Sequence, residues 1–200
     1  AWMDHKERRV KNEHWIVWIK PAIFIWALDL MAQGADWTIL LTASAVIAYA
    51  SMSVIGRPSL KDLLSGSKID LIVTTWYMVS LTGVICGAIL YQQSLPLDVL
   101  VGNDTTLGAL WWKTLAVGAS ILIIDLAWRL RLIHGGADAK CLMWVAILIP
   151  SWSALPLTYS SATVDSIISL PPAISLLMWG GFIFLLIPFI LLAKNLSNGN

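Results

Sequence analysis

Two polar stretches of the chain each place an aspartate beside cationic residues at the edge of an apolar run. Residues 4–15 contain Asp4, and residues 132–140 contain Asp138. Two carboxyl groups held about 3 Å apart share one proton, because both cannot ionise cheaply at that distance. The ionised carboxyl can then take a proton from water while the neutral one polarises a peptide carbonyl. These residue types could therefore hydrolyse a peptide bond without a metal ion.

Each stretch also has an ordinary structural explanation. Gly135 and Gly136 could end one helix while Asp138 N-caps the next, because glycine is common at helix C-termini and aspartate accepts hydrogen bonds from the free amides of a helix start. Residues 4–15 could be a solvated basic segment beside a membrane. From spacing alone the structural explanation is the stronger one for both stretches. The residues by themselves establish two boundary aspartates and no more.

The elements that must position these aspartates are apolar. The 200-residue chain is 58% hydrophobic and 12% charged, with a mean hydropathy of +0.77, whereas an average soluble domain is roughly 25% charged. Six apolar stretches approach the roughly 20 residues that a membrane-spanning helix needs. They cover residues 15–31, 37–55, 71–91, 107–133, 139–155 and 173–193. The sequence therefore predicts an all-α, polytopic membrane helical bundle, a single domain over residues 1–200 with about six transmembrane helices.

The loops between these stretches alternate in their content of lysine and arginine. Cationic residues occur in segments 1–14, 56–70 and 129–140, whereas segments 32–36, 92–106 and 156–172 contain none. Loops rich in lysine and arginine stay on the cytoplasmic side of a membrane. We therefore expect a multi-pass protein of the cell membrane with both aspartate stretches on its cytoplasmic face.

Three stretches resemble a known family, the GxGD membrane aspartic proteases, and in particular the archaeal prepilin and preflagellin peptidases, which are type IV prepilin peptidase-like. The second aspartate motif of that family is similar to Gly135-Gly136-Ala137-Asp138-Ala139-Lys140, in which Ala137 replaces the second glycine. The first motif is similar to Asp4-x-x-x-Arg8-x-Val10-x-Asn12-x-x-Trp15. Residues 188–199 look like a late helix of the archaeal members.

The resemblance implies that Asp4 and Asp138 are the catalytic pair of an aspartic endopeptidase. It implies supporting roles for Arg8, Asn12, Gly135, Gly136, Ala137 and Lys140. The expected substrates are type IV pilin-like or archaellin precursors, cut between a basic leader peptide and an apolar helix, and no cofactor is implied. A helix N-terminus stabilises negative charge, which weakly favours Asp138 as the ionised member. Which aspartate acts as base stays open.

The resemblance also has consequences for the ends and the middle of the chain. The first motif of the family follows a membrane helix, whereas this sequence begins at Ala1, so a further helix is expected upstream. Stretches 37–55 and 71–91 separate the two motifs more widely than in the shortest family members. Because two inserted spans are an even number, both motifs still face the same side. The cysteine-rich loop of the methylating bacterial relatives is missing, and methylation is not predicted.

Two other classes of function stay open. A small transporter or channel would use Asp29, Lys113 and Asp125 as pathway residues inside the membrane, although the sequence has no visible internal repeat. A non-enzymatic membrane scaffold could pack through the Gly180-Gly181 step. Proteolysis that depends on the aspartates would distinguish the enzyme from both.

The remaining polar and reactive residues point to structural roles. Asp125 lies four residues before Arg129, which predicts an ion pair within one helix. Cys86 and Cys141 have neither a disulfide framework nor a metal-type spacing, and the three histidines are scattered singly, so no metal site is expected. A net charge of +1 gives no basic field for a nucleic-acid partner.

Overall fold

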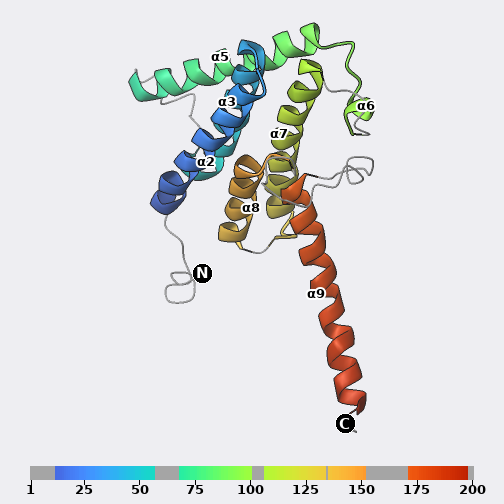
Figure 1. Ribbon diagram of the computed structural model, residues 1–200. Coiled ribbons are helices and arrows are strands. Elements are labelled where there is room, and N and C mark those ends of the chain that lie inside the picture. The colour runs from blue at the N-terminus through green and yellow to red at the C-terminus, as the bar shows by residue number, and fades with distance from the viewer. Residues whose placement is uncertain (1–11, 57–67, 101–105, 134, 152–170, 198–200) are drawn as a thin grey trace.

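A computed structural model describes residues 12–56, 68–100, 106–133, 135–151 and 171–197 (Figure 1). Its elements are the helices α2 (Asn12–Ala32), α3 (Trp37–Ile55), α5 (Lys68–Leu90), α6 (Pro96–Leu100), α7 (Leu107–Arg129), α8 (Gly136–Leu148) and α9 (Pro172–Ser197). No strand occurs over these residues. The all-helical class predicted from the sequence is therefore confirmed, and a helix lies at each of the six predicted apolar stretches.

Four of these helices are long and apolar enough to cross a membrane among the residues described: α2, α5, α7 and α9. The apolar helix α3 is shorter. Helix α8 has 13 residues, which at 1.5 Å per residue is about 20 Å, less than the roughly 30 Å of a hydrocarbon core. The chain is thus a helical membrane protein with four candidate spans, and six crossings remain a prediction.

Two helices end earlier than the apolar stretches that predicted them, for local reasons. The fifth stretch was expected to continue to residue 155, but α8 ends at Leu148. Proline disfavours the helical conformation of the residue before it, and Ile149, which precedes Pro150, has φ −125° and ψ 77°. The fourth stretch was expected to continue to residue 133, but α7 ends at Arg129.

Side-chain contacts fix the direction of α2 relative to α8. The indole N–H of Trp144 on α8 donates to the carbonyl oxygen of Trp18 on α2 at 2.9 Å. One turn earlier on each helix, Lys140 and Trp15 line the same hollow. These two helices therefore run in parallel and begin at the same end of the bundle, which we call the motif end because residues 135–140 and the last residues of stretch 4–15 lie there.

Helices α3 and α7 begin at the other end. Thr42 of α3 accepts a hydrogen bond from the indole of Trp111 at 3.1 Å, and the hydroxyl of Tyr49 donates to Asp125 at 3.0 Å. The later residue of α3 thus contacts the later residue of α7, so the two helices are parallel to each other. Because a short loop joins α2 to α3, both α3 and α7 run antiparallel to α2. We call the end where α3 and α7 begin the cap end, because Asp36 N-caps α3 there.

Helix α5 packs closely along α3 in the opposite direction. A Cβ atom at Gly83 would lie 2.4 Å from the Cβ of Leu41 and 2.7 Å from the backbone nitrogen of Thr42. Further along the same interface the hydroxyls of Ser44 and Ser80 are 2.9 Å apart. Small residues let membrane helices approach this closely, and hydrogen bonds between hydroxyls add to the attraction.

The buried core lies between α2, α3, α7 and α8. Its largest fully buried apolar side chains are Trp26, Ile39, Val117, Ile121, Ile124 and Ile147. They come from four helices that are separated along the chain, so the core ties the first and last of these helices together. This packing is what holds the start of α8 beside the start of α2.

The cap end has its own polar cluster. The carboxylate of Asp36 accepts hydrogen bonds from the hydroxyl of Thr38 at 2.6 Å, the backbone amide of Ile39 at 3.0 Å and the hydroxyl of Tyr91. Burial alone would raise the pKa of Asp36, but these hydrogen bonds together lower it below its usual value. Burial and the neighbouring carboxylate raise the pKa of Tyr91. The cluster joins the start of α3 to the end of α5.

Helix α9 stands apart from the bundle and extends away from it (Figure 1). Only its first residues, Pro172 and Ala173, are buried. Every residue from Met178 to Ser197 is exposed, although the helix is the most apolar candidate span, with a mean hydropathy of 2.5. A helix that is apolar on all sides belongs in lipid.

Candidate active site at the motif end

Asp138 lies in the first turn of α8, at the motif end, and its side chain is exposed. The N-cap of α8 is Gly135, and the first intrahelical hydrogen bond runs from the amide of Ala139 to the carbonyl of Gly135 at 3.1 Å. The suggestion that Asp138 caps this helix is therefore wrong, because Asp138 is three residues inside it. Within the described part of the chain its carboxylate has no recorded hydrogen bond or ion pair.

Two glycines before Asp138 determine how its carboxylate lies. A Cβ atom at Gly135 would be 2.2 Å from Oδ2 of Asp138, so the carboxylate folds back over the space that a side chain would fill. A Cβ atom at Gly136 would be 3.2 Å from the ring of Trp128, a close but nearly tolerable contact. The glycines thus give room to the carboxylate and, less strictly, to the indole. Ala137, which replaces a glycine of the family pattern, is a helical residue of α8.

Helix α7 ends in a turn that precedes Gly135 and Gly136 and does not involve them. The amide of Leu132 donates to Ala127 O at 2.9 Å, and that of Arg131 donates to Trp128 O at 3.0 Å. This pair of bonds is a Schellman motif, in which glycine usually occupies the position held by Arg131. Arg131 has φ 61°, a left-handed conformation that costs an L-residue about 1 kcal/mol. The idea that Gly135 and Gly136 end α7 is therefore wrong, since Arg131 does so.

The other half of the predicted pair is only partly described. Asn12 is the first residue of α2, at the motif end. Asp4 and Arg8 lie outside the described residues. What the structure brings together is the start of α2, which follows the first motif, and the start of α8, which contains the second. They share an end because α2 and α8 pack in parallel.

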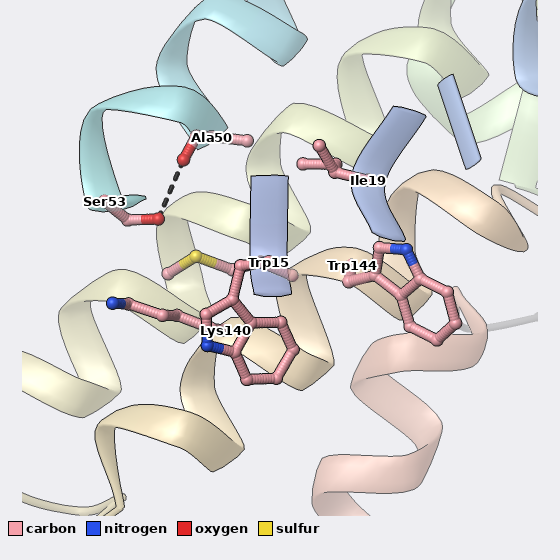
Figure 2. A pocket seen from close by; sticks show the side chains of 7 residues that line it. Trp15, Ile19, Ala50, Ser53, Lys140 and Trp144 are labelled. Carbon is pink, nitrogen blue, oxygen red and sulfur yellow. Dashed lines mark hydrogen bonds between the residues drawn. The ribbon is translucent and has the colours of Figure 1, made fainter. Parts of the chain in front are cut away.

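A hollow lies between α2, α3 and α8 at the motif end (Figure 2). The hollow itself is small, about 10 Å³, which is room for roughly one water molecule. Its lining is Trp15 and Ile19 from α2, Ala50 and Ser53 from α3, and Lys140, Met143 and Trp144 from α8. The hydroxyl of Ser53 donates to the carbonyl of Ala50 at 2.7 Å, the bond drawn in Figure 2. Lys140, predicted as a support residue, is half-buried and lines the hollow together with Trp15.

An ion pair between an exposed arginine and a buried aspartate stabilises α7 near the same end. Asp125, 7% exposed, accepts a hydrogen bond from Nε of Arg129 at 2.9 Å, which confirms the predicted ion pair within the helix. The sequence did not predict the third member, Tyr49, whose hydroxyl donates to the same carboxylate oxygen of Asp125. No local pattern reveals it, because Tyr49 lies 76 residues earlier on α3. The three residues join α3 to the last turn of α7.

The residues expected for a transport pathway are divided between the two ends of the bundle, with Asp29 and Lys113 toward the cap end and Asp125 toward the motif end. Asp29 lies near the end of α2 and accepts a hydrogen bond from Gln33 at 2.8 Å. Lys113 is exposed near the start of α7, at the cap end, whereas Asp125 lies toward the motif end of that helix. Gly180 and Gly181, proposed for scaffold packing, have no atom within 4 Å of an added Cβ.

Metal and cysteine chemistry is not indicated by the described residues. No group of three or more histidine, cysteine, aspartate or glutamate side chains lies close enough there to hold a metal ion. Cys86 and Cys141 are both free thiols.

Comparison with models of protein families, with characterised proteins and with solved structures finds no match for this chain.

Proposed function

We propose that the protein is a membrane-embedded aspartic endopeptidase that removes basic leader peptides from type IV pilin-like or archaellin precursors. The observation that carries the proposal is the exposed carboxylate of Asp138 in the first turn of α8, beside the start of α2. A polar side chain at a helix start is usually committed to capping, whereas this carboxylate has no recorded partner among the described residues. Together with the resemblance of residues 135–140 to an aspartate motif, its availability favours chemistry.

In the proposed reaction Asp4 and Asp138 form one catalytic pair. One carboxylate takes a proton from water, and the neutral partner donates a hydrogen bond to the peptide carbonyl as water adds to its carbon. The tetrahedral intermediate then collapses, the C–N bond breaks, and the leaving amine receives a proton. Seven residues separate Asp4 from Asn12, at the start of α2. Even well short of full extension, such a segment can reach the start of a neighbouring helix.

The site also suits a substrate that lies partly in lipid. We place the motif end at the cytoplasmic face, where a basic leader stays in water while the apolar helix that follows it enters the bilayer. The scissile bond between them would then be at the level of Asp138. A soluble, unstructured peptide lacks the apolar helix and should be cut far more slowly.

The test uses the full chain, reconstituted in lipid vesicles with a leader-bearing precursor, and follows loss of the leader by gel mobility. Asp138→Asn and Asp4→Asn should each reduce cleavage at least about 100-fold, the usual range for a proton-transfer group. The double variant should be hardly worse than either single one, because residues of one catalytic unit are not additive. Asp98→Asn, on α6, is the matched control and should cleave normally.

Asparagine is nearly isosteric with aspartate and tolerates a helix start, so insertion should survive both substitutions. If a properly inserted Asp138→Asn protein cleaved the precursor at the wild-type rate, the peptidase proposal would be wrong.

A further inference from the structure

The buried carboxylate of Asp125 takes no part in the proposed reaction, yet it lies one turn before the end of α7 and is only 7% exposed. An ionisable residue inside a membrane helix is costly, so it is usually paired and often has a function. Its Oδ2 atom accepts one hydrogen bond from Nε of Arg129 at 2.9 Å and another from the hydroxyl of Tyr49 at 3.0 Å. We call these three residues the Asp125 cluster.

The two hydrogen bonds of the Asp125 cluster differ in what they hold together. Arg129 is four residues after Asp125, so this ion pair lies within α7 and does not fix that helix relative to another one. The bond from Tyr49 joins α7 to α3 toward the motif end, whereas Thr42 and Trp111 join the same two helices near the cap end. The hydroxyl of Tyr49 therefore fixes the last turns of α7 against α3.

The last turn of α7 in turn holds the segment that leads into α8. The carbonyl oxygen of Ala127 accepts hydrogen bonds from the amides of Leu132 and Ile133, at 2.9 Å and 3.3 Å. The ring of Trp128 packs against Gly136, where an added Cβ atom would lie 3.2 Å from it. Because both contacts reach from α7 to the segment around the start of α8, a shift of the end of α7 would also move that start.

We propose that Tyr49 and Asp125 are positioning residues, which keep the Asp138 carboxylate in place for reaction by fixing the end of α7 on α3. This proposal rests on the peptidase function proposed above. The carboxylate of Asp138 lies in the space that Gly135 leaves open, so a small shift of the preceding segment changes where it points. Misplacing a reacting group by about 1 Å can lower a rate about 100-fold.

The first part of the test does not depend on cleavage. Hydrogen exchange of the full chain in detergent micelles is followed by mass spectrometry over residues 130–133. Tyr49→Phe keeps the ring and removes the hydroxyl, and should speed exchange there about tenfold, the effect of one hydrogen bond to a charged group on local opening. Tyr77→Phe is the matched control, because its hydroxyl lies 3.2 Å from Oγ of Ser51 and joins α5, not α7, to α3. It should leave this exchange unchanged.

The second part of the test measures cleavage of a leader-bearing precursor by the reconstituted chain. Tyr49→Phe should lower kcat about tenfold and leave KM unchanged, whereas Tyr77→Phe should cleave as the wild type does. Asp125→Asn removes the charge and should also lower kcat, so it tests the cluster even if Tyr49→Phe does not fold. In a Gly135→Ala protein the carboxylate is already displaced, and adding Tyr49→Phe should cost little more, because changes that act through one group are not additive.

Unchanged exchange over residues 130–133 in both Tyr49→Phe and Asp125→Asn would overturn the proposal, whether or not the protein cleaves a precursor. Faster exchange with a normal kcat would overturn it too, and so would fully additive losses in the Gly135→Ala, Tyr49→Phe double variant, which indicate a role in overall stability. A wild-type protein that cleaves no precursor but shows the expected exchange would contradict the peptidase function alone, since Tyr49 would still hold the segment before Asp138.

Discussion

At the cap end the Asp36 carboxylate accepts hydrogen bonds from two side chains and a backbone amide, whereas at the motif end the Asp138 carboxylate is exposed and has no recorded bond to a described residue. Both groups are aspartates that lie at the start of an apolar helix. Asp36 caps its helix from outside, while Asp138 is already inside its own.

The difference separates a carboxylate that stabilises the fold from one that is available for chemistry. A carboxylate with satisfied oxygens contributes to stability and resists protonation, because its partners favour the charged form. A carboxylate without partners contributes little to stability and can exchange protons with water or a substrate. The glycines differ in the same way. Gly83 leaves room for the backbone of a packed helix, whereas Gly135 leaves room for the carboxylate of Asp138.

The largest effect is expected from Gly135→Ala, which should lower the rate of precursor cleavage and so tests the role of the exposed carboxylate at the motif end. The added methyl would collide with Oδ2 of Asp138, and displacing a reacting group by about 1 Å can lower a rate about 100-fold. Cleavage by the reconstituted full chain should fall by that factor. Its thermal unfolding should not change, because φ −92° and ψ 116° suit alanine. Gly136→Ala is the matched control and should have a much smaller effect, since only the ring of Trp128 must move slightly.

If Gly135→Ala retained full activity, the carboxylate position seen here would not matter for catalysis.

The next largest effect, on the stability of the fold, is expected from Gly83→Ala at the contact between α3 and α5. Its methyl would meet the backbone of Thr42 at 2.7 Å, so the two helices must separate. Overpacking of this kind lowers the free energy of unfolding by about 2 kcal/mol. Denaturation in detergent micelles should show the loss, while the cleavage rate of the folded protein stays the same.

The matched control is Gly180→Ala on α9, where nothing lies within 4 Å of the new methyl. That change should stabilise the protein slightly or not at all, since alanine is the better helix former. Equal stability of the two variants would contradict the close packing of α3 on α5.

The smallest effect is expected from Asp36→Ala, which removes the N-cap of α3 and a partner of Tyr91. The loss should be about 1.5 kcal/mol of unfolding free energy, measured in the same micelles. Asp36→Asn should lose less, because asparagine also caps helices.

The difference in stability between the wild type and Asp36→Ala should depend on pH if it comes from the charge of Asp36. The folded pKa of Asp36 is below its usual value of 3.8, so the carboxylate stabilises the fold above that value and its contribution is lost as the pH falls through the folded pKa. The gap in stability between wild type and Asp36→Ala should therefore be full at neutral pH and narrow below pH 3.8. A gap that stayed constant on acidification would show that the charge of Asp36 is not its source.

The sequence by itself determined the class of the protein and the approximate place of its helices. Long apolar runs require helices in lipid, because the backbone must satisfy its own hydrogen bonds there. The ion pair of Asp125 with Arg129 followed from helical spacing alone. Helix ends were less certain, because Pro150 and the left-handed Arg131 act locally and stop two helices earlier than apolarity suggests.

Only the tertiary structure decided which of these local features meet. Tyr49 reaches Asp125 across 76 residues, and Tyr91 reaches Asp36 across 55. The pairing of α2 with α8, which brings the starts of both motif-bearing helices to one end, rests on contacts such as Trp144 with Trp18. Periodicity and composition report only what lies within a helical turn or along one apolar run. The faces that two distant helices turn toward each other depend on the packing of the whole bundle, and this is why the candidate site needed the fold.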